Sequence, residues 1–207
     1  MREEVNEAFQ SVVGFVREVH AEEIDGAYEY FWEEDYPEDF LMGAALDLAF
    51  INFEDWLVCD YRRPDGSSYI DLYLEKNEAS AAQKTIMEAM KGSLISLYEV
   101  ARTGGETVVL RDLLLDREAV LSGEVPGELK LGDLFAARLL EIDGQRVMAP
   151  CVYPYGRGHR DAVLDFIDKQ FSRYVKNKNP EGTMAQYLKD ESYIFNTIWI
   201  TSIFKLK

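Results

Sequence analysis

The sequence is short of the residues that most catalytic and metal sites use. It has two histidines, His20 and His159, and two cysteines, Cys59 and Cys151, which are far apart in the chain. These four residues do not have the spacing of a zinc site. The sequence also has no Gly-x-Ser-x-Gly elbow and no glycine-rich phosphate loop. We therefore assign no catalytic residue and no metal ligand, and we expect no cofactor.

Basic residues are scarce as well. The chain has 22 Lys and Arg against 38 Asp and Glu, which gives a formal net charge of −16. Proteins that bind nucleic acids neutralise phosphates with clusters of Lys and Arg, so this balance argues against that class. The same repulsion disfavours anionic membrane surfaces. A basic protein partner, or simple solubility, fits the charge better.

Long apolar runs are missing too. The longest apolar stretch, Phe40–Phe53, is interrupted by Asp47 and Asn52 and is too short to cross a bilayer. The first residues are Met-Arg-Glu-Glu-Val, with charges where a signal peptide has its apolar core. Two buried thiols in a reducing compartment fit the cysteine content better than a disulfide does. We expect a cytoplasmic protein.

The apolar content that is present predicts a folded chain. Hydrophobic residues make up 47% of the 207 residues and aromatic residues 13%. A globule of this size buries roughly 70% of the surface of its unfolded chain and needs no metal or disulfide to fold. We expect residues 1–207 to form one compact α+β unit, with a helical part at 1–92, a small antiparallel β unit at 93–153 and closing helices at 154–207.

Helices are predicted by periodicity and by capping residues. Val5, Phe9, Val12 and Val16 form one apolar stripe. The stretch Phe40–Leu57 is apolar on nearly every side, which is typical of a buried central helix. Capping boxes, in which a hydroxyl and a side chain three residues later each bond a free backbone N–H, predict three more helix starts: Ser68 with Asp71, Ser80 with Gln83, and Thr183 with Gln186.

Short Val- and Leu-rich segments separated by turn residues predict the β unit. An Asp143-Gly144 turn joins the last two of them. Phe135, Ala137 and Leu139 alternate with other apolar residues, so we expect this strand to be covered on both faces. Residues 194–206 fit a helix or a strand, and the preceding capping box favours a helix. The predicted strands are Leu94–Arg102, Thr107–Leu110, Ala119–Ser122, Phe135–Glu141 and Gln145–Val152.

An acidic segment with interleaved aromatic residues is the first candidate site. Residues 22–39 contain nine Asp and Glu and no Lys or Arg. We expect a basic partner to bind here, through Tyr28, Glu29, Trp32 and Glu33. The spacing of Glu29, Glu33 and Glu34 also suits a hard cation. A solvated acidic face explains these three residues better than a metal site does.

A basic cluster is the second candidate. It leads from the last predicted strand into a helix whose free N–H groups favour an anion. Its two arginines suit a phosphate or a carboxylate. The alternative is an ordinary connection in which these arginines pair with acidic residues of the protein. The candidate anion-binding residues are Tyr155, Arg157, Gly158, His159 and Arg160.

Four stretches of the sequence together resemble a group of uncharacterised bacterial proteins: "FEDWLVCDYRRPDG", "SLYEV", "LRDLL" and "GDLFAARLL". In that group, a helical N-terminal half precedes a small β region. Some similar proteins carry a C-terminal cysteine-rich zinc motif of the SEC-C type, which this chain lacks. The resemblance covers about residues 50–150. It implies the α+β arrangement and brings no activity with it.

Three hypotheses for the function follow. The first is a non-enzymatic binding or adaptor protein that recognises a basic partner through the segment Tyr28–Asp39. The second is an enzyme or sensor that binds a small anionic ligand at residues 153–160. The third is an acidic mimic of nucleic acid, which needs carboxylates spaced like phosphates. The sequence leaves the oligomeric state open.

Overall fold

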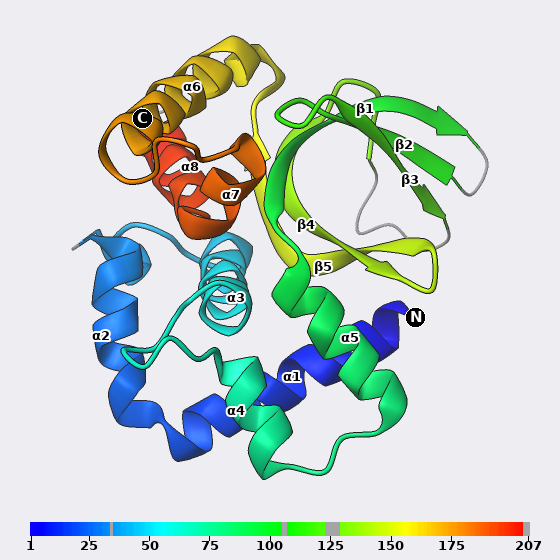
Figure 1. Ribbon diagram of the computed structural model, residues 1–207. Coiled ribbons are helices and arrows are strands. Elements are labelled where there is room, and N and C mark those ends of the chain that lie inside the picture. Colours follow the sequence, from blue (N-terminus) through cyan, green and yellow to red (C-terminus); the bar gives the residue numbers. More distant parts are fainter. Residues whose placement is uncertain (34, 105–106, 123–128, 205–207) are drawn as a thin grey trace.

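The computed structural model describes residues 1–33, 35–104, 107–122 and 129–204 (Figure 1). Helices lie at both ends of this described part and one sheet lies between them, so the predicted α+β class is confirmed. The N-terminal helices are α1 (Arg2–Val19), α2 (Ala21–Trp32), α3 (Ala44–Cys59), α4 (Tyr69–Lys76) and α5 (Ala81–Gly92). The strands are β1 (Ile95–Gly104), β2 (Thr107–Asp112), β3 (Arg117–Ser122), β4 (Leu134–Ile142) and β5 (Gln145–Tyr155), and α6 (Arg160–Asn177), α7 (Met184–Asp190) and α8 (Ile194–Phe204) follow.

The central helix is α3, which lies between α2 and the sheet (Figure 1). Every residue from Asn52 to Cys59 is buried, so the prediction of a buried helix is confirmed. The prediction that it begins at Phe40 was wrong. A 3₁₀ turn at Pro37–Asp39 comes first, and α3 begins at Ala44, after Gly43. Gly43 has φ +58°, a left-handed conformation that residues with a Cβ rarely adopt.

All three predicted capping boxes are present. The Ser68 hydroxyl accepts from the backbone N–H of Asp71 at the start of α4. The corresponding pairs lie at the starts of α5 and α7. Each box satisfies two backbone N–H groups that a helix terminus otherwise leaves without a partner.

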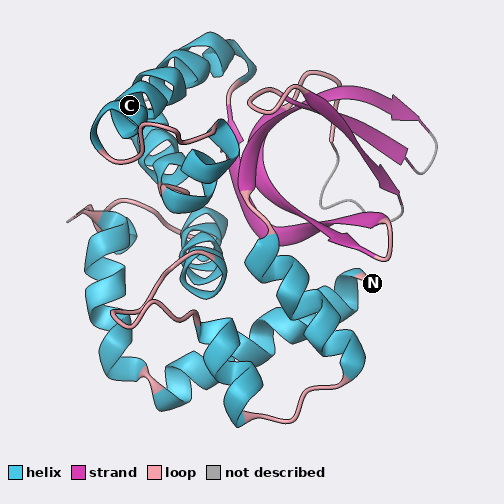
Figure 2. Ribbon diagram, viewed as in Figure 1, coloured by secondary structure: helices cyan, strands magenta, loops and turns pink. Residues whose placement is uncertain are grey.

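The five strands form one curved antiparallel sheet in the order β3-β2-β1-β4-β5 (Figure 2). All five predicted strands are confirmed, with ends that differ by a few residues. The Asp143-Gly144 turn joins β4 to β5, and both residues have positive φ, 51° and 74°. Two consecutive positive φ values are what a type I′ two-residue hairpin turn requires.

Strand β4 is covered on both faces, as predicted. Phe135 and Ala137 belong to a small apolar cluster on one side of the sheet. Leu134, Ala136 and Leu140 belong to the large core that the sheet shares with the helices at both ends of the chain. The alternating side chains of one strand therefore contribute to two clusters.

The C-terminal segment is a helix. Ile194–Phe204 forms α8, so the favoured alternative is confirmed for the residues that the structure describes. Residues 205 and 206 lie outside them. Helices α6, α7 and α8 pack together beside β5 and α3 (Figure 1). No helix of the described residues has the length and apolar character needed to cross a membrane.

Candidate functional site

The acidic segment forms an open hollow on one side of α2. Glu29 and Glu33 are exposed and lie one helical turn apart. The hollow is lined by these two side chains together with Gly26, Tyr30 and Tyr36. In the part of the chain that the structure describes, neither carboxylate of this pair has an ion-pair partner. Both are therefore available to a cation from outside.

Tyr30 is the exposed aromatic residue of this hollow. It is 55% exposed, yet its ring is held in place from two sides. It stacks on Trp56 of α3, with centroids 5.9 Å apart and an interplanar angle of 18°. Its other contact is edge-on with Tyr193, at 5.5 Å. A fixed aromatic face beside two carboxylates suits a Lys or Arg side chain, because ring and carboxylate both attract the cation.

Tyr28 and Trp32, the two aromatic residues expected to contact a partner, lie differently. Trp32 is buried in the core. The Tyr28 hydroxyl donates to Glu38 at 2.7 Å, and burial, reinforced by that carboxylate, raises the pKa of Tyr28. The Tyr28 ring is stacked on Tyr36. Of the four residues predicted from the sequence, the structure therefore leaves Glu29 and Glu33 facing solvent, and Tyr30 joins them.

The two arginines of the predicted anion site have carboxylate partners. Both Nε and Nη2 of Arg157 donate to Asp133, at 3.1 and 2.6 Å. This hydrogen bonding lowers the pKa of Asp133. Arg160 contacts Asp161 at 3.3 Å and Glu99 at 3.8 Å. An anion at this place therefore competes with carboxylates already in position.

The other residues of that prediction do not converge on one point. Tyr155 is buried, and its hydroxyl donates to the carbonyl of Phe195 at 2.9 Å. Gly158 is exposed within a 3₁₀ turn that precedes α6. Nδ1 of His159 is buried without a hydrogen-bond partner. The ring lies against Gly156, where a Cβ would come within 3.1 Å of Nδ1. The segment is a close-packed connection between β5 and α6.

A buried ionic network was not predicted from the sequence. Arg138 of β4 is 0% exposed. Its Nε donates to Asp55 at 2.9 Å, Nη2 contacts Asp60, and Nη1 donates to the carbonyl of Ser93 at 3.1 Å. Arg138 lies where the β4–β5 register shifts, between Ala137 and Leu139. One guanidinium therefore joins the sheet to the C-terminal part of α3, through Asp55 and Asp60, and to Ser93, which precedes β1.

Lys189 of α7 completes this network. Its ammonium donates to Asp60 at 2.6 Å and to the carbonyls of Cys59 and Ser93 at 3.1 and 2.8 Å. Two cations thus face two carboxylates, so the buried charges compensate one another. The C-terminal helices are attached to α3 through this lysine. We call Asp55, Asp60, Arg138 and Lys189 the core ionic network.

The pKa shifts within the core ionic network follow from burial and pairing. Burial raises the pKa of Asp55 and outweighs its pairing with Arg138. Burial acts the same way on Asp60, but Arg138 and Lys189 together outweigh it and leave the pKa of Asp60 lowered. Burial also raises the pKa of the Cys151 thiol, as it does for Cys59. Both cysteines are free and buried, as predicted, and thiols of this kind are poor nucleophiles.

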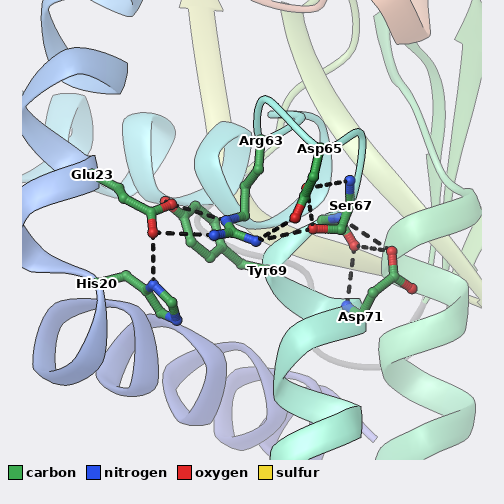
Figure 3. Close-up of polar contacts among 8 residues, drawn as sticks. His20, Glu23, Arg63, Asp65, Ser67, Tyr69 and Asp71 are labelled. Atoms are coloured by element: carbon green, nitrogen blue, oxygen red, sulfur yellow. Dashed lines mark hydrogen bonds and ion pairs between the residues drawn. The ribbon is translucent and has the colours of Figure 1, made fainter.

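A second cluster ties α2 to the turn after α3 (Figure 3). The Arg63 guanidinium points at the Glu23 carboxylate, with Nε and Nη2 donating at 2.8 and 3.1 Å. His20 and Tyr69 contact the same carboxylate, at 2.9 and 3.2 Å. The hydrogen bond from Arg63 is the largest influence on Glu23 and lowers its pKa to about 2. This cluster orients the N-terminal end of α2, which carries the acidic hollow further along.

Metal binding finds no support in the residues that the structure describes. Among them, no group of three or more His, Cys, Asp or Glu is arranged to hold a metal ion. Glu34, the third residue of the cation alternative, lies outside the described residues.

The fold and the site define an acidic α+β protein with an exposed acidic hollow and a buried ionic network. The model of a family of unknown function, DUF7986, matches residues 49–189. The match covers more than half of the chain, so the chain belongs to that family, and the resemblance to uncharacterised proteins is confirmed. No curated protein and no solved structure matches the chain. The core ionic network lies wholly within the matched range, whereas the acidic hollow on α2 lies before it.

Proposed function

We propose that this protein binds a basic segment of another protein at the acidic hollow of α2. The observation that carries the proposal is the triad of Glu29, Tyr30 and Glu33. These three side chains are exposed side by side, and the described residues supply no cation to either carboxylate. The Tyr30 ring also stacks on Trp56, so a partner's cation meets an aromatic face that is already positioned.

The charge around the hollow supports a cationic partner. From residue 18 to residue 61 the sequence has no Lys or Arg. The Asp and Glu of this segment therefore attract an approaching basic segment before it makes contact, with Lys178 near Tyr30 as an opposing charge. Contacts between exposed charges are individually weak, about 0.2–1 kcal/mol each. Several together give a complex that forms at low salt and weakens as salt is added.

A binding role fits the described residues better than a catalytic one. Groups with strongly shifted pKa values, among them Arg138, Cys151 and Tyr153, are fully buried and so closed off from a substrate. The two cysteines have raised pKa values and are buried. One observation still favours the anion-binding alternative at Arg157 and Arg160: Nδ1 of His159 is buried without a hydrogen-bond partner. That alternative requires displacement of Asp133 or Glu99. The nucleic-acid mimic remains a third alternative.

The test is a titration of the full chain with a fluorescein-labelled peptide of five Arg-Gly repeats, followed by anisotropy. A peptide of five Gln-Gly repeats is the uncharged control. We expect the arginine peptide alone to bind at low salt. The double variant Glu29→Gln, Glu33→Gln should weaken binding about five- to tenfold, because it removes two contacts of the size given above.

The matched control is the double variant Asp165→Asn, Asp168→Asn on α6. These two carboxylates are exposed, and their replacement changes the net charge by the same amount. If both double variants weaken binding equally, the attraction comes from overall charge and the hollow is not the site. Tyr30→Ala should weaken binding while Tyr30→Phe keeps it, since Phe retains the aromatic face.

A further inference from the structure

A second hollow lies on the opposite side of α2, bordered by three helices and partly open to solvent. It is a cavity of about 200 Å³ between α1, α2 and α3. Its walls are apolar, from Val13 and Val16 of α1, Ile24 of α2, and Phe53 and Leu57 of α3. This cavity and the acidic hollow have no lining residue in common. This cavity is therefore separate from the acidic hollow.

The size of the cavity suits a small ring. An apolar cavity of about 150 Å³ in a protein core accommodates benzene. A volume of about 200 Å³ leaves room for a ring and a few further atoms. Apolar walls favour the transfer of such a group from water.

One charged group of the core lies in this apolar wall. Glu54 of α3 is 9% exposed, and burial raises the pKa of its carboxyl against the opposing effect of Arg17. A carboxylate taken out of water is costly unless a cation compensates it. Among the described residues, Arg17 alone supplies that cation, through a contact of Nη2 with Oε1. Oε2 has no hydrogen-bond partner in this set.

Few contacts hold the Arg17 side chain beside Glu54. Its side chain is 67% exposed, so it holds Glu54 from the rim of the cavity and not from within. If it turned into solvent, it would lose this one contact, and Glu54 would then need another cation. The next basic residue along the chain is Arg62, so no residue of α2 or α3 can supply a second cation. A cation that also fills the apolar cavity would hold Glu54 with more contacts than Arg17 does.

We propose that this cavity binds a small organic cation with an apolar body, such as an arylalkyl primary amine. The ammonium group pairs with the Glu54 carboxylate in place of the Arg17 guanidinium, and the ring lies against Val16, Phe53 and Leu57. Carboxylates and phosphates of the same size are disfavoured, because their negative charge would lie beside that of Glu54. The Glu54 carboxylate in an apolar wall thus selects a cation with an apolar body.

The probes for this proposal are benzylamine, benzyl alcohol and benzoate, which share a ring and differ in charge. In two-dimensional methyl NMR of the full chain, benzylamine should shift the methyl signals of Val16, Ile24 and Leu57. It should bind about tenfold more tightly than benzyl alcohol, since hydrogen bonds to charged groups exceed neutral ones by about that factor. Benzoate should leave these signals unchanged.

Three variants locate the charge that selects the amine. Glu54→Gln keeps the shape of the side chain and should abolish the preference for benzylamine over benzyl alcohol. Arg17→Ala removes the competing cation and should raise the affinity for benzylamine about two- to fivefold. Glu18→Gln is the matched control, because Glu18 is an exposed neighbour of Arg17 and its replacement removes the same charge. It should leave the preference intact.

The wild-type measurement alone can overturn the proposal. If benzylamine and benzyl alcohol bind equally, or if benzylamine shifts signals of the acidic hollow and leaves Val16 and Leu57 unchanged, no amine site exists in this cavity. An equal loss of preference in Glu18→Gln and Glu54→Gln would show that the attraction is general. Apart from shifts at the acidic hollow itself, these outcomes do not bear on the binding of a basic peptide at Glu29 and Glu33.

Discussion

Asn52 of α3 and Val152 of β5 exchange two hydrogen bonds. The Asn52 Nδ2 donates to the carbonyl of Val152, and the N–H of Val152 donates to Oδ1, each at 2.9 Å. Strand β5 is at the edge of the sheet, so this side-chain amide takes the place of a neighbouring strand. The central helix and the sheet are thereby fixed in register.

Replacement of Asn52 should therefore weaken the hydrogen bonding of the Val152 backbone more than that of other positions. We expect Asn52→Ala to lower the free energy of unfolding by about 2–3 kcal/mol, because it leaves two partly buried backbone groups of Val152 without partners. Amide hydrogen exchange should accelerate at Val152. The exposed Asn6→Ala is the control. Unchanged protection of Val152 in Asn52→Ala would show that these two bonds do not hold the edge.

Loss of Arg138 should be among the most costly substitutions. Arg138→Met leaves Asp55 and Asp60 buried without their main cation, which costs about 3–5 kcal/mol in comparable cases. Urea denaturation measures this cost. Arg111→Met is the matched control, since Arg111 is exposed and pairs with Asp116 at 3.7 Å. It should cost less than about 1 kcal/mol. Equal effects of the two variants would contradict the importance of the core ionic network.

The cluster around Glu23 predicts a loss of stability in acid. The pKa of Glu23 is about 2 in the folded chain and 4.5 as the ordinary value, so its contribution is complete above pH 4.5. That contribution is lost as pH falls through about 2. Because the side chain is partly exposed, we expect Glu23→Gln to cost about 1 kcal/mol at pH 7. The difference from wild type should shrink steadily between pH 4.5 and pH 2. A difference independent of pH would contradict this account.

Trp56 connects stability and binding. It is buried in α3 and supports the exposed Tyr30. Trp56→Ala should lower the free energy of unfolding by about 3–5 kcal/mol, and a loss below about 1 kcal/mol would place the helix at the surface. In conditions where the variant is folded, it should also bind the arginine peptide more weakly than Trp56→Phe does, since Phe keeps an aromatic surface under Tyr30.

The anion-binding alternative has its own test. An anion site at Arg157 and Arg160 would make sulfate raise the melting temperature more than chloride at matched ionic strength. The double variant Arg157→Ala, Arg160→Ala would then abolish the difference. Because both arginines already contact carboxylates, we expect wild type and variant to respond alike. Sulfate stabilises proteins in general, so the variant decides between the two outcomes.

Local patterns in the sequence were enough for most of the fold. Capping boxes, the Asp143-Gly144 turn and the alternation along β4 depend on residues close in the chain, and all three were predicted. The start of α3 was missed because the left-handed Gly43 and the turn before it interrupt an apolar run that reads as one helix. Phe40 and Met42 are apolar like the residues of α3, but they are not part of the helix.

The sites were harder to predict because they depend on distant contacts. Arg138 and Asp55 are 83 positions apart, and no periodicity connects them. A signal did exist: Arg138 is a lone charge within "LFAARLL", a strand expected to be covered on both faces, so it needed a buried partner. In the acidic segment, Trp32 shares a helix face with Tyr28, four residues earlier, and that face packs on the core. Tyr30, between them, lies on another side of the helix, against Trp56 and Tyr193, and is about half exposed.

The most direct test of the proposed function is an amide NMR titration of the full chain with the arginine-glycine peptide at low salt. Binding at the hollow predicts shifts concentrated at Gly26–Glu33 and at Tyr36, with α6 unchanged, and their loss when salt is added. Shifts of equal size on α6, around Asp165 and Asp168, would show attraction to the acidic surface as a whole. No shift at Glu29, Tyr30 and Glu33 at any peptide concentration would contradict the proposed function outright.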